Sequence, residues 1–205
     1  MFTDDRTSQA RIRDAALRLF AAHGPGAVTI RDVASEAEVS PALVIRHFTS
    51  KDGLRDAVDE HVTDVFETML THALTVDSSS PFEQAALPSL AETVLRHLPA
   101  DSAIPGYLAW MLIGGGEAGS ALFARLYDVS VATLAGMVDA GQASAGADPA
   151  TRAAFLLTND LAMLMLRPRL TEVLHIDPLS TAGMRRWAAE ALSIYRDGIT
   201  PQTDQ

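Results

Sequence analysis

Three cationic side chains, Arg31, Arg46 and Lys51, fall within one short stretch that also holds small and apolar residues. An arginine guanidinium can bind the edge of a guanine base through two hydrogen bonds, and residues such as Ala42 and Leu43 can contact the methyl group of a thymine. Lys51 is the only lysine of the chain. It lies where a helix is expected to begin, and there the backbone amides and the helix dipole also favour an anion. These residue types suit contacts with bases and phosphates.

A second group with chemical potential is the glycine-rich segment from Gly114 to Gly119, which matches a dinucleotide phosphate loop and is followed by Asp139. That loop works only between a buried strand and a helix, whereas the flanks here have helical patterns. An enzyme that binds a nucleotide cofactor through this segment is the alternative hypothesis. His61 and Asp64 share a helix face, but no third ligand follows at a metal-site spacing. We expect no catalytic residue, no metal and no cofactor.

The composition excludes several classes of protein. The chain has 205 residues, enough to bury a substantial core, and no cysteine, which excludes disulfides, thiolate zinc sites and cysteine nucleophiles. Residues 1–8 are polar, unlike a signal peptide. The most apolar run, from Tyr107 to Ile113, is far shorter than the roughly 20 residues of a membrane-spanning helix. We therefore expect a soluble, cytoplasmic protein with no membrane partner.

The formal net charge of −10 is distributed unevenly. Residues 1–56 hold eight basic and eight acidic side chains, so the whole excess of negative charge lies in residues 57–205. Binding to nucleic acid usually relies on cationic surface, and the neutral first segment is compatible with such a partner although the chain as a whole is acidic. Two regions with different electrostatic tasks are implied.

Apolar residues recur at helical spacing along the chain and no segment alternates clearly enough for a strand, so we predict an all-α fold of about nine helices. The first helix spans about residues 7–22 and ends at the glycines and proline of residues 23–26. Thr29 and Asp32 form a capping box for a short second helix that ends near Glu38. Ser40 and Pro41 then begin a third helix of about seven residues.

The later helices are placed by capping signals. A fourth helix over residues 51–72 begins after Ser50, and another spans residues 81–98. Further starts lie near Ala103, near Glu117 and at Asp148. The last two helices, over residues 149–167 and 180–197, are separated by a segment that contains Pro168 and the Asp177–Pro178 pair.

The second and third helices, joined by a tight turn around residues 37–40, have the proportions of a helix-turn-helix. Val33, Val39, Val44 and Phe48 can form the small core that fixes their angle. We therefore predict a DNA-binding domain over residues 1–50 and a helical body over residues 51–205, with the helix over residues 51–72 connecting the two.

In about its first 60 residues the sequence resembles the TetR family of bacterial regulators. The matching residues are Ala15, Leu19, Phe20, Gly24, Thr29, Ile30, Val33, Ala34, Val39, Ser40, His47, Phe48, Lys51, Asp52 and Leu54. That family usually has Gly where Glu38 stands, Gly or Pro at Ala42, and Tyr at Ile45. Glu38 fits if the turn residue does not require positive φ. Ile45 lacks the hydroxyl that donates to phosphate in relatives.

The resemblance implies a DNA-binding transcriptional regulator, expected to be a repressor that a small-molecule effector releases from a palindromic operator. It places Arg31, Pro41, Ala42, Leu43 and Arg46 near bases. It assigns phosphate contacts to three further residues, which are Thr29, His47 and Lys51. Ser40 and Ile45 complete the predicted DNA-binding set.

The resemblance also implies that the acidic region is a ligand-binding and dimerisation body. Two apolar helix faces would form a homodimer interface, with Leu157, Leu161, Leu164, Met184, Trp187, Ala188, Ala191, Leu192 and Tyr195. A largely apolar effector would lie among Phe66, Met69, Tyr107, Trp110, Met111, Phe123, Tyr127 and Met137. The alternatives are that these faces complete the monomer core and that these aromatic and methionine side chains fill it.

Overall fold

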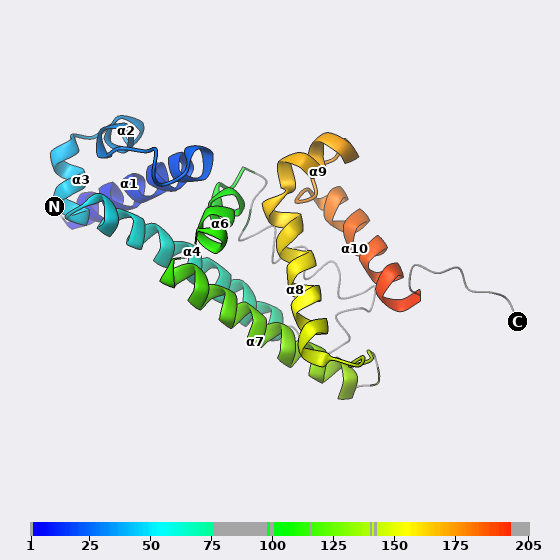
Figure 1. The fold of residues 1–205 in the computed structure, drawn as a ribbon. Coiled ribbons are helices and arrows are strands. Elements are labelled where there is room, and N and C mark those ends of the chain that lie inside the picture. The colour runs from blue at the N-terminus through cyan, green and yellow to red at the C-terminus, as the bar shows by residue number, and fades with distance from the viewer. Residues whose placement is uncertain are drawn as a thin grey trace, which may run out of the picture. The chain divides into compact units, whose positions relative to one another are not determined.

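The computed structural model describes residues 2–75, 98, 101–114, 116–139, 141 and 143–197, with the side chains of residues 2–6, 70–75, 192 and 195–197 excepted. Within these residues the chain forms nine α-helices and no strand (Figure 1), which confirms the predicted all-α fold. The helices are α1 (Phe2–His23), α2 (Ile30–Glu36), α3 (Pro41–Phe48), α4 (Lys51–Thr75), α6 (Ile104–Ile113), α7 (Glu117–Asp139), α8 (Pro149–Met165), α9 (Arg167–Leu174) and α10 (Thr181–Asp197). The helix predicted over residues 81–98 lies outside the described residues.

The chain divides into two compact units, and the division does not fall at residue 50. One unit consists of residues 1–67 and 102–128, and the other of residues 68–101 and 129–205. The helices α1, α2, α3 and α6 therefore belong to one unit together with most of α4. These units are defined by packing and not by function. The predicted functional boundary at residue 50 therefore stays a prediction.

The core of the first unit is built on the apolar stripe of α1, in which Ile12, Ala15, Ala16 and Phe20 are completely buried. Burial of side chains as large as Ile12 and Phe20 contributes roughly 1.5–3 kcal/mol each and fixes the helices that meet there. The partners come from α2, α3, α4 and α6. They include Val33, Val44, Leu54, Val58, Val62, Tyr107 and Leu108, all at most 1% exposed.

In the second unit, α8 buries the face that carries Ala153, Leu157 and Leu161. The hydroxyl of Ser130 on α7 donates to the carbonyl of Ala153 at 2.9 Å, which ties α7 to α8. Asp148 caps α8 as predicted, since its carboxylate accepts from the amide of Thr151 at 3.1 Å. Hydrogen bonding to Thr151 lowers the pKa of Asp148 below its ordinary value.

The segment around Pro168 was predicted to separate two helices, but it contains a helix of its own. Arg167–Leu174 is a helix, and Pro168 lies in its first turn, where proline is tolerated because that amide has no intrahelical partner. The guanidinium of Arg167 binds the carboxylate of Asp177 at 2.9 and 2.7 Å, which closes the loop after α9. The bond from Arg167 lowers the pKa of Asp177. A proline can thus start a helix as well as end one.

One described helix, α7, is long and apolar enough to cross a membrane by length and composition alone. Part of α7 packs within the protein, although only 22% of its most apolar stretch is buried in the described residues. Arg125 pairs with Glu67 on α4, and the buried side chains of Leu122, Leu126, Leu134 and Met137 lie along its length. A core helix of a folded domain has this same composition.

Candidate DNA-binding site

The start of α2 is fixed by a reciprocal pair of hydrogen bonds between Thr29 and Asp32. The amide of Asp32 donates to the Thr29 hydroxyl at 3.2 Å, and the Thr29 amide donates to the Asp32 carboxylate at 2.8 Å. The hydroxyl of Thr29 also donates to that carboxylate at 2.8 Å. These bonds, the backbone one foremost, lower the pKa of Asp32. The predicted capping box is confirmed, and Thr29 uses its hydroxyl proton within the chain.

The turn between α2 and α3 contains Glu38 in the left-handed region, with φ of 54°. The condition under which glutamate fits without strain, a turn that does not require positive φ, is therefore not met. In this conformation the amides of Glu38 and Val39 donate to the carbonyls of Ser35 and Ala34 at 3.1 and 2.9 Å and satisfy the end of α2. Arg11 of α1 donates to the carbonyl of Ala37 at 2.6 Å and so ties the turn to α1.

The start of α3 is capped as predicted, with the Ser40 hydroxyl accepting from the amide of Leu43 at 3.2 Å and Pro41 in the first turn. Val44 and Phe48 are buried on the inner face of α3. The opposite face carries Ala42, Ile45 and Arg46, all exposed. A short helix packed on one side and open on the other has the form required to enter the major groove.

The structure brings the predicted DNA-binding residues together at α2, α3 and the start of α4. Those with exposed side chains are Thr29, Arg31, Ser40, Pro41, Ala42, Ile45 and Arg46. Leu43, His47 and Lys51 are half-buried. The His47 ring lies beside that of Phe48, with centroids 6.2 Å apart. None of the ten is fully buried, so all remain compatible with a contact to DNA.

The connection from α3 to α4 is tighter than the sequence indicates. Thr49 has φ of 67°, which is unusual for a β-branched residue. A Cβ on Gly53 would lie 2.3 Å from the carbonyl oxygen of Phe48, so only glycine fits there. Ser50 caps α4 through the Gly53 amide at 3.0 Å, as predicted. The Lys51 ammonium, at the first position of α4, donates to the carbonyl of Gly26 at 3.1 Å.

Comparisons with known proteins agree with this geometry. Residues 12–58 match the family described as bacterial regulatory proteins of the tetR family, and residues 100–200 match the tetracyclin repressor-like C-terminal domain. The HTH-type transcriptional regulatory protein RaaS of Mycobacterium tuberculosis is 32% identical over 204 residues, covering 97% of this chain and 90% of RaaS. The chain belongs to the TetR family. It is therefore a DNA-binding transcription regulator.

Other relatives extend the likeness. An HTH-type transcriptional repressor of M. tuberculosis is 38% identical over 89 residues, which cover 43% of this chain and 45% of that protein. The TetR family protein CprB from S. coelicolor A3(2) has a similar fold, with a TM-score of 0.68 at 21% identity, covering 96% of this chain and 91% of CprB. SmeT, the repressor of a Stenotrophomonas maltophilia multidrug efflux pump, gives a TM-score of 0.62 at 23% identity, covering 95% and 94% of the two chains.

In this TetR regulator, α6 is joined to α1 by contacts that sequence analysis did not find. The indole Nε1 of Trp110 donates to the carbonyl of Ala21 at 3.4 Å. The rings of Tyr107 and Phe20 lie 6.0 Å apart. Gly106 lies against Ala21, where an added Cβ would come within 3.3 Å of the alanine methyl. The apolar pattern of residues 107–113 indicated burial but not the partner.

A buried polar pair links α6 to α4. The Tyr107 hydroxyl donates to the Asp59 carboxylate at 2.5 Å, and Arg55 lies 3.8 Å from its other oxygen. Asp59 is 8% exposed, and burial raises its pKa although Tyr107 and Arg55 oppose the shift. Burial and the neighbouring carboxylate also raise the pKa of Tyr107. The hydroxyl donor and the carboxylate acceptor thus satisfy each other where both side chains are buried.

The eight residues predicted to line an effector site are divided between the two units. Phe66, Tyr107 and Met111 are buried in the first unit, whereas Trp110 and Phe123 there are 48% and 41% exposed. Tyr127 also belongs to the first unit, and Met69 and Met137 belong to the second. Tyr107 and Trp110 make the helix contacts described above. Their role as effector contacts stays a prediction.

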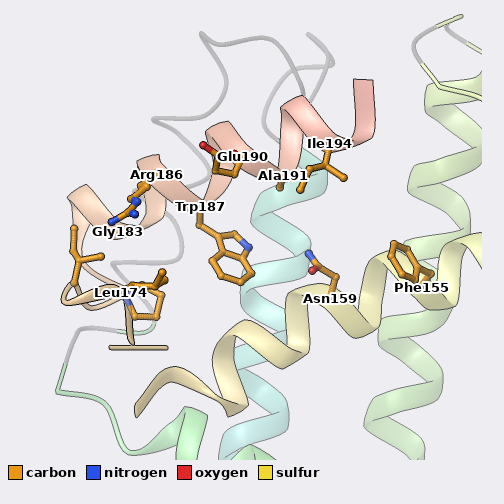
Figure 2. A pocket seen from close by; sticks show the side chains of 11 residues that line it. Phe155, Asn159, Leu174, Gly183, Arg186, Trp187, Glu190, Ala191 and Ile194 are labelled. Atoms are coloured by element: carbon orange, nitrogen blue, oxygen red, sulfur yellow. The ribbon is translucent and has the colours of Figure 1, made fainter. Parts of the chain in front are cut away.

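A cavity of about 640 Å³ lies in the second unit between α8, the loop after α9 and α10 (Figure 2). It is lined by Phe155, Asn159, Leu174, Ile176, Pro178, Gly183, Arg186, Trp187, Glu190, Ala191 and Ile194. None of the eight predicted effector residues is among them. Two residues of the predicted dimer interface, Trp187 and Ala191, are.

The other predicted interface residues have mixed environments. Leu157 and Leu161 are 8% and 5% exposed within the single chain, so they already belong to its core. Leu164, Met184 and Ala188 are half-buried. The side chains of the remaining two, Leu192 and Tyr195, lie outside the described residues.

The glycine segment does not form a phosphate loop in the described residues. Gly114 is the C-cap of α6, and Glu117 begins α7, so both flanks are helices. Gly119 lies inside α7, where an added Cβ would meet the carbonyl of Met111 at 2.0 Å. Gly119 thus allows α6 and α7 to approach closely, and the enzyme hypothesis loses the strand it requires.

Proposed function

We propose that this TetR regulator is a homodimeric repressor that binds a palindromic operator and leaves it when a small, largely apolar effector binds its acidic helical body. One observation carries the DNA-binding half of the proposal. The helix α3 is capped, packed on one face through Val44 and Phe48, and open on the face that holds Ala42, Ile45 and Arg46. Repression is supported by the M. tuberculosis relative that carries that description.

In this proposal α3 lies in the major groove and α2 crosses the backbone. Arg31, Pro41, Ala42, Leu43 and Arg46 face bases. The phosphate contacts come from the start of α2 and the region where α3 meets α4. They involve Thr29, His47 and Lys51. Because the Thr29 hydroxyl donates to Asp32 in the free chain, we assign to Thr29 the role of presenting the α2 terminus to the phosphate.

The homodimer forms in this proposal through the faces of α8 and α10 that border the cavity. Phe155 and Ile194 are 65% and 45% exposed there, which is costly for an isolated chain in water. Trp187 projects from α10 toward α8 (Figure 2). A two-fold axis through this surface relates the DNA-binding helices of the two chains, and the operator then consists of two inverted half-sites.

Release by an effector requires that the ligand binds two conformations unequally. The contacts of α6 with α1 and α4 supply a route, since any shift of α6 changes Trp110 against Ala21 and Tyr107 against Asp59. The proposal places the protein in the cytoplasm, where its operator lies.

Selection of bound fragments from random duplex DNA with the full-length protein tests the proposal. The expected result is one enriched sequence with inverted symmetry, bound by two chains per duplex in sedimentation measurements. No enrichment at low ionic strength, or an enriched asymmetric sequence bound by one chain, contradicts it.

The dimer surface has its own test. Phe155→Glu places a charge on the exposed cavity rim without entering the buried core, and it should yield monomers with strongly reduced operator affinity. Val173→Glu is the matched control, since Val173 is 70% exposed on α9 but does not line the cavity. That variant should remain dimeric. A dimeric Phe155→Glu protein would contradict the assigned interface.

A further inference from the structure

Ile45 is a large apolar side chain that is exposed on the outer face of α3. Its side chain is 43% exposed. Among the side chains described between residues 7 and 69, it is the only large apolar one with that degree of exposure. It also stands in the middle of α3, the helix whose outer face is proposed to meet DNA.

The neighbours of Ile45 leave its outer surface accessible. Ala42 lies one turn earlier on the same face, is exposed and has only a methyl side chain. Arg46 is exposed beside it, and the buried side chains of Val44 and Phe48 lie on the opposite face. The backbone at Ile45 is held by the Thr49 amide, which donates to its carbonyl at 2.8 Å. Ile45 is thus held on a hydrogen-bonded helix backbone, with part of its side chain open to an approaching group.

We propose that Ile45 is a specificity-determining residue that reads thymine by packing against its C5 methyl group in the major groove. The inference rests on the proposed function and names part of the operator chemistry. An isoleucine side chain can neither donate nor accept a hydrogen bond, so it cannot hold a phosphate. Of the groups that base pairs present in the major groove, the thymine methyl is the apolar one.

The charges on the outer face of α3 are consistent with this assignment. Arg46 is the one formally cationic side chain of Pro41–Phe48, and the acidic Glu38 and Asp52 lie exposed near the two ends of the helix, where Lys51 is the cation assigned to a phosphate. Within α3 itself, the formal positive charge available to phosphates is that of Arg46. The discrimination of this face between sequences therefore depends on shape and apolar contact as well as on the guanidinium.

Replacing thymine with deoxyuracil tests the inference, because uracil keeps the base pair and removes only the methyl group. The duplex is the sequence enriched by the wild-type protein, with single substitutions at each thymine. For wild type, each contacted methyl should be worth about fourfold in Kd, the value expected for burying one methyl-sized group. Ile45→Ala should bind the thymine duplex more weakly and no longer distinguish thymine from uracil at the contacted position.

Ile113→Ala is the matched control, because Ile113 is 77% exposed on α6 and takes no part in the proposed DNA surface. It should discriminate as wild type does. Thermal unfolding of both variants checks that the folds are intact. If wild type binds every uracil duplex as tightly as thymine, or if Ile45→Ala keeps the discrimination, the inference is wrong while DNA binding stands. If no sequence is enriched at all, the proposed function itself fails.

Discussion

The indole of Trp110 on α6 lies against Gly24, the residue that follows the end of α1. Gly24 has φ of 80°, and a Cβ built on it would lie 3.0 Å from Cη2 of Trp110. Glycine is therefore required twice at this position, for its backbone conformation and for the approach of the ring. The contact joins α1, the helix that supports the DNA-binding residues, to α6. A movement of either helix therefore displaces the other.

Gly24→Ala should lower the free energy of unfolding by about 1–3 kcal/mol, because the new methyl meets the indole and the backbone is left-handed. Denaturant unfolding measures the change. Gly26→Ala is the control, since an added Cβ there has no atom within 4 Å. In a Trp110→Ala background, Gly24→Ala should lower the free energy of unfolding by less, because the clash with the indole is gone and only the strain of the left-handed backbone remains. Equal effects of Gly24→Ala and Gly26→Ala would show that the indole contact does not constrain the turn.

Glu38→Gly should stabilise the protein by roughly 0.5–1 kcal/mol. The residue adopts φ of 54°, and removing its Cβ relieves more strain than the added freedom of the unfolded chain costs. Glu38→Ala keeps the Cβ and removes the charge, so it should leave the thermal midpoint nearly unchanged. A gain in Glu38→Ala as large as that in Glu38→Gly would assign the effect to charge and not to conformation.

Asp59 should make the stability of the first unit depend on pH. Its pKa is raised in the folded chain, chiefly by burial, so its contribution is fullest below its ordinary value of 3.8 and is lost as pH rises through the raised pKa. Asp59→Asn keeps an oxygen that accepts from Tyr107 and cannot ionise. Its free energy of unfolding relative to wild type should therefore increase between pH 4 and pH 7, as measured by denaturant titration at each pH. A difference that is constant or falls with pH would contradict the buried, raised carboxyl.

Arg46 and Lys51 should affect DNA binding in different ways. Arg46→Ala removes a base contact and should relax the preference for one base pair in each half-site, at a cost of about 1–3 kcal/mol. Lys51→Ala removes a phosphate contact and should reduce the slope of log K against log salt by about one per chain, with little change in sequence preference. Binding measured over a salt series on matched and mismatched duplexes separates the two. Identical, sequence-independent losses from both variants would refute these roles.

Local signals in the sequence were sufficient for much of the fold and of the DNA-binding site. The caps at Thr29, Ser40 and Asp148 each depend on side chains within three residues, and each is present. The buried faces of α1 and α3 follow from helical spacing. Such features depend on short-range chemistry, which a single sequence records directly.

What the sequence did not reveal depends on contacts between distant residues or on backbone angles. Tyr107 and Trp110 have the composition of a ligand site, but their partners, Asp59 and Ala21, are 48 and 89 residues away. The positive φ of Glu38 could not be predicted, because glutamate does not indicate a left-handed backbone as glycine would. Pro168 reads equally well as the end of one helix or the start of another, and the loop closed by Arg167 and Asp177 decides between them.

The central claim is that α3 of each chain in a dimer reads bases from the major groove, and methylation interference tests it most directly. Dimethyl sulfate methylates guanine N7 in the major groove and adenine N3 in the minor groove. N7 methylation at symmetric guanines in the two half-sites should block binding of wild type, and Arg46→Ala should lose this sensitivity. Interference confined to adenine N3, or none in either groove, would contradict the claim.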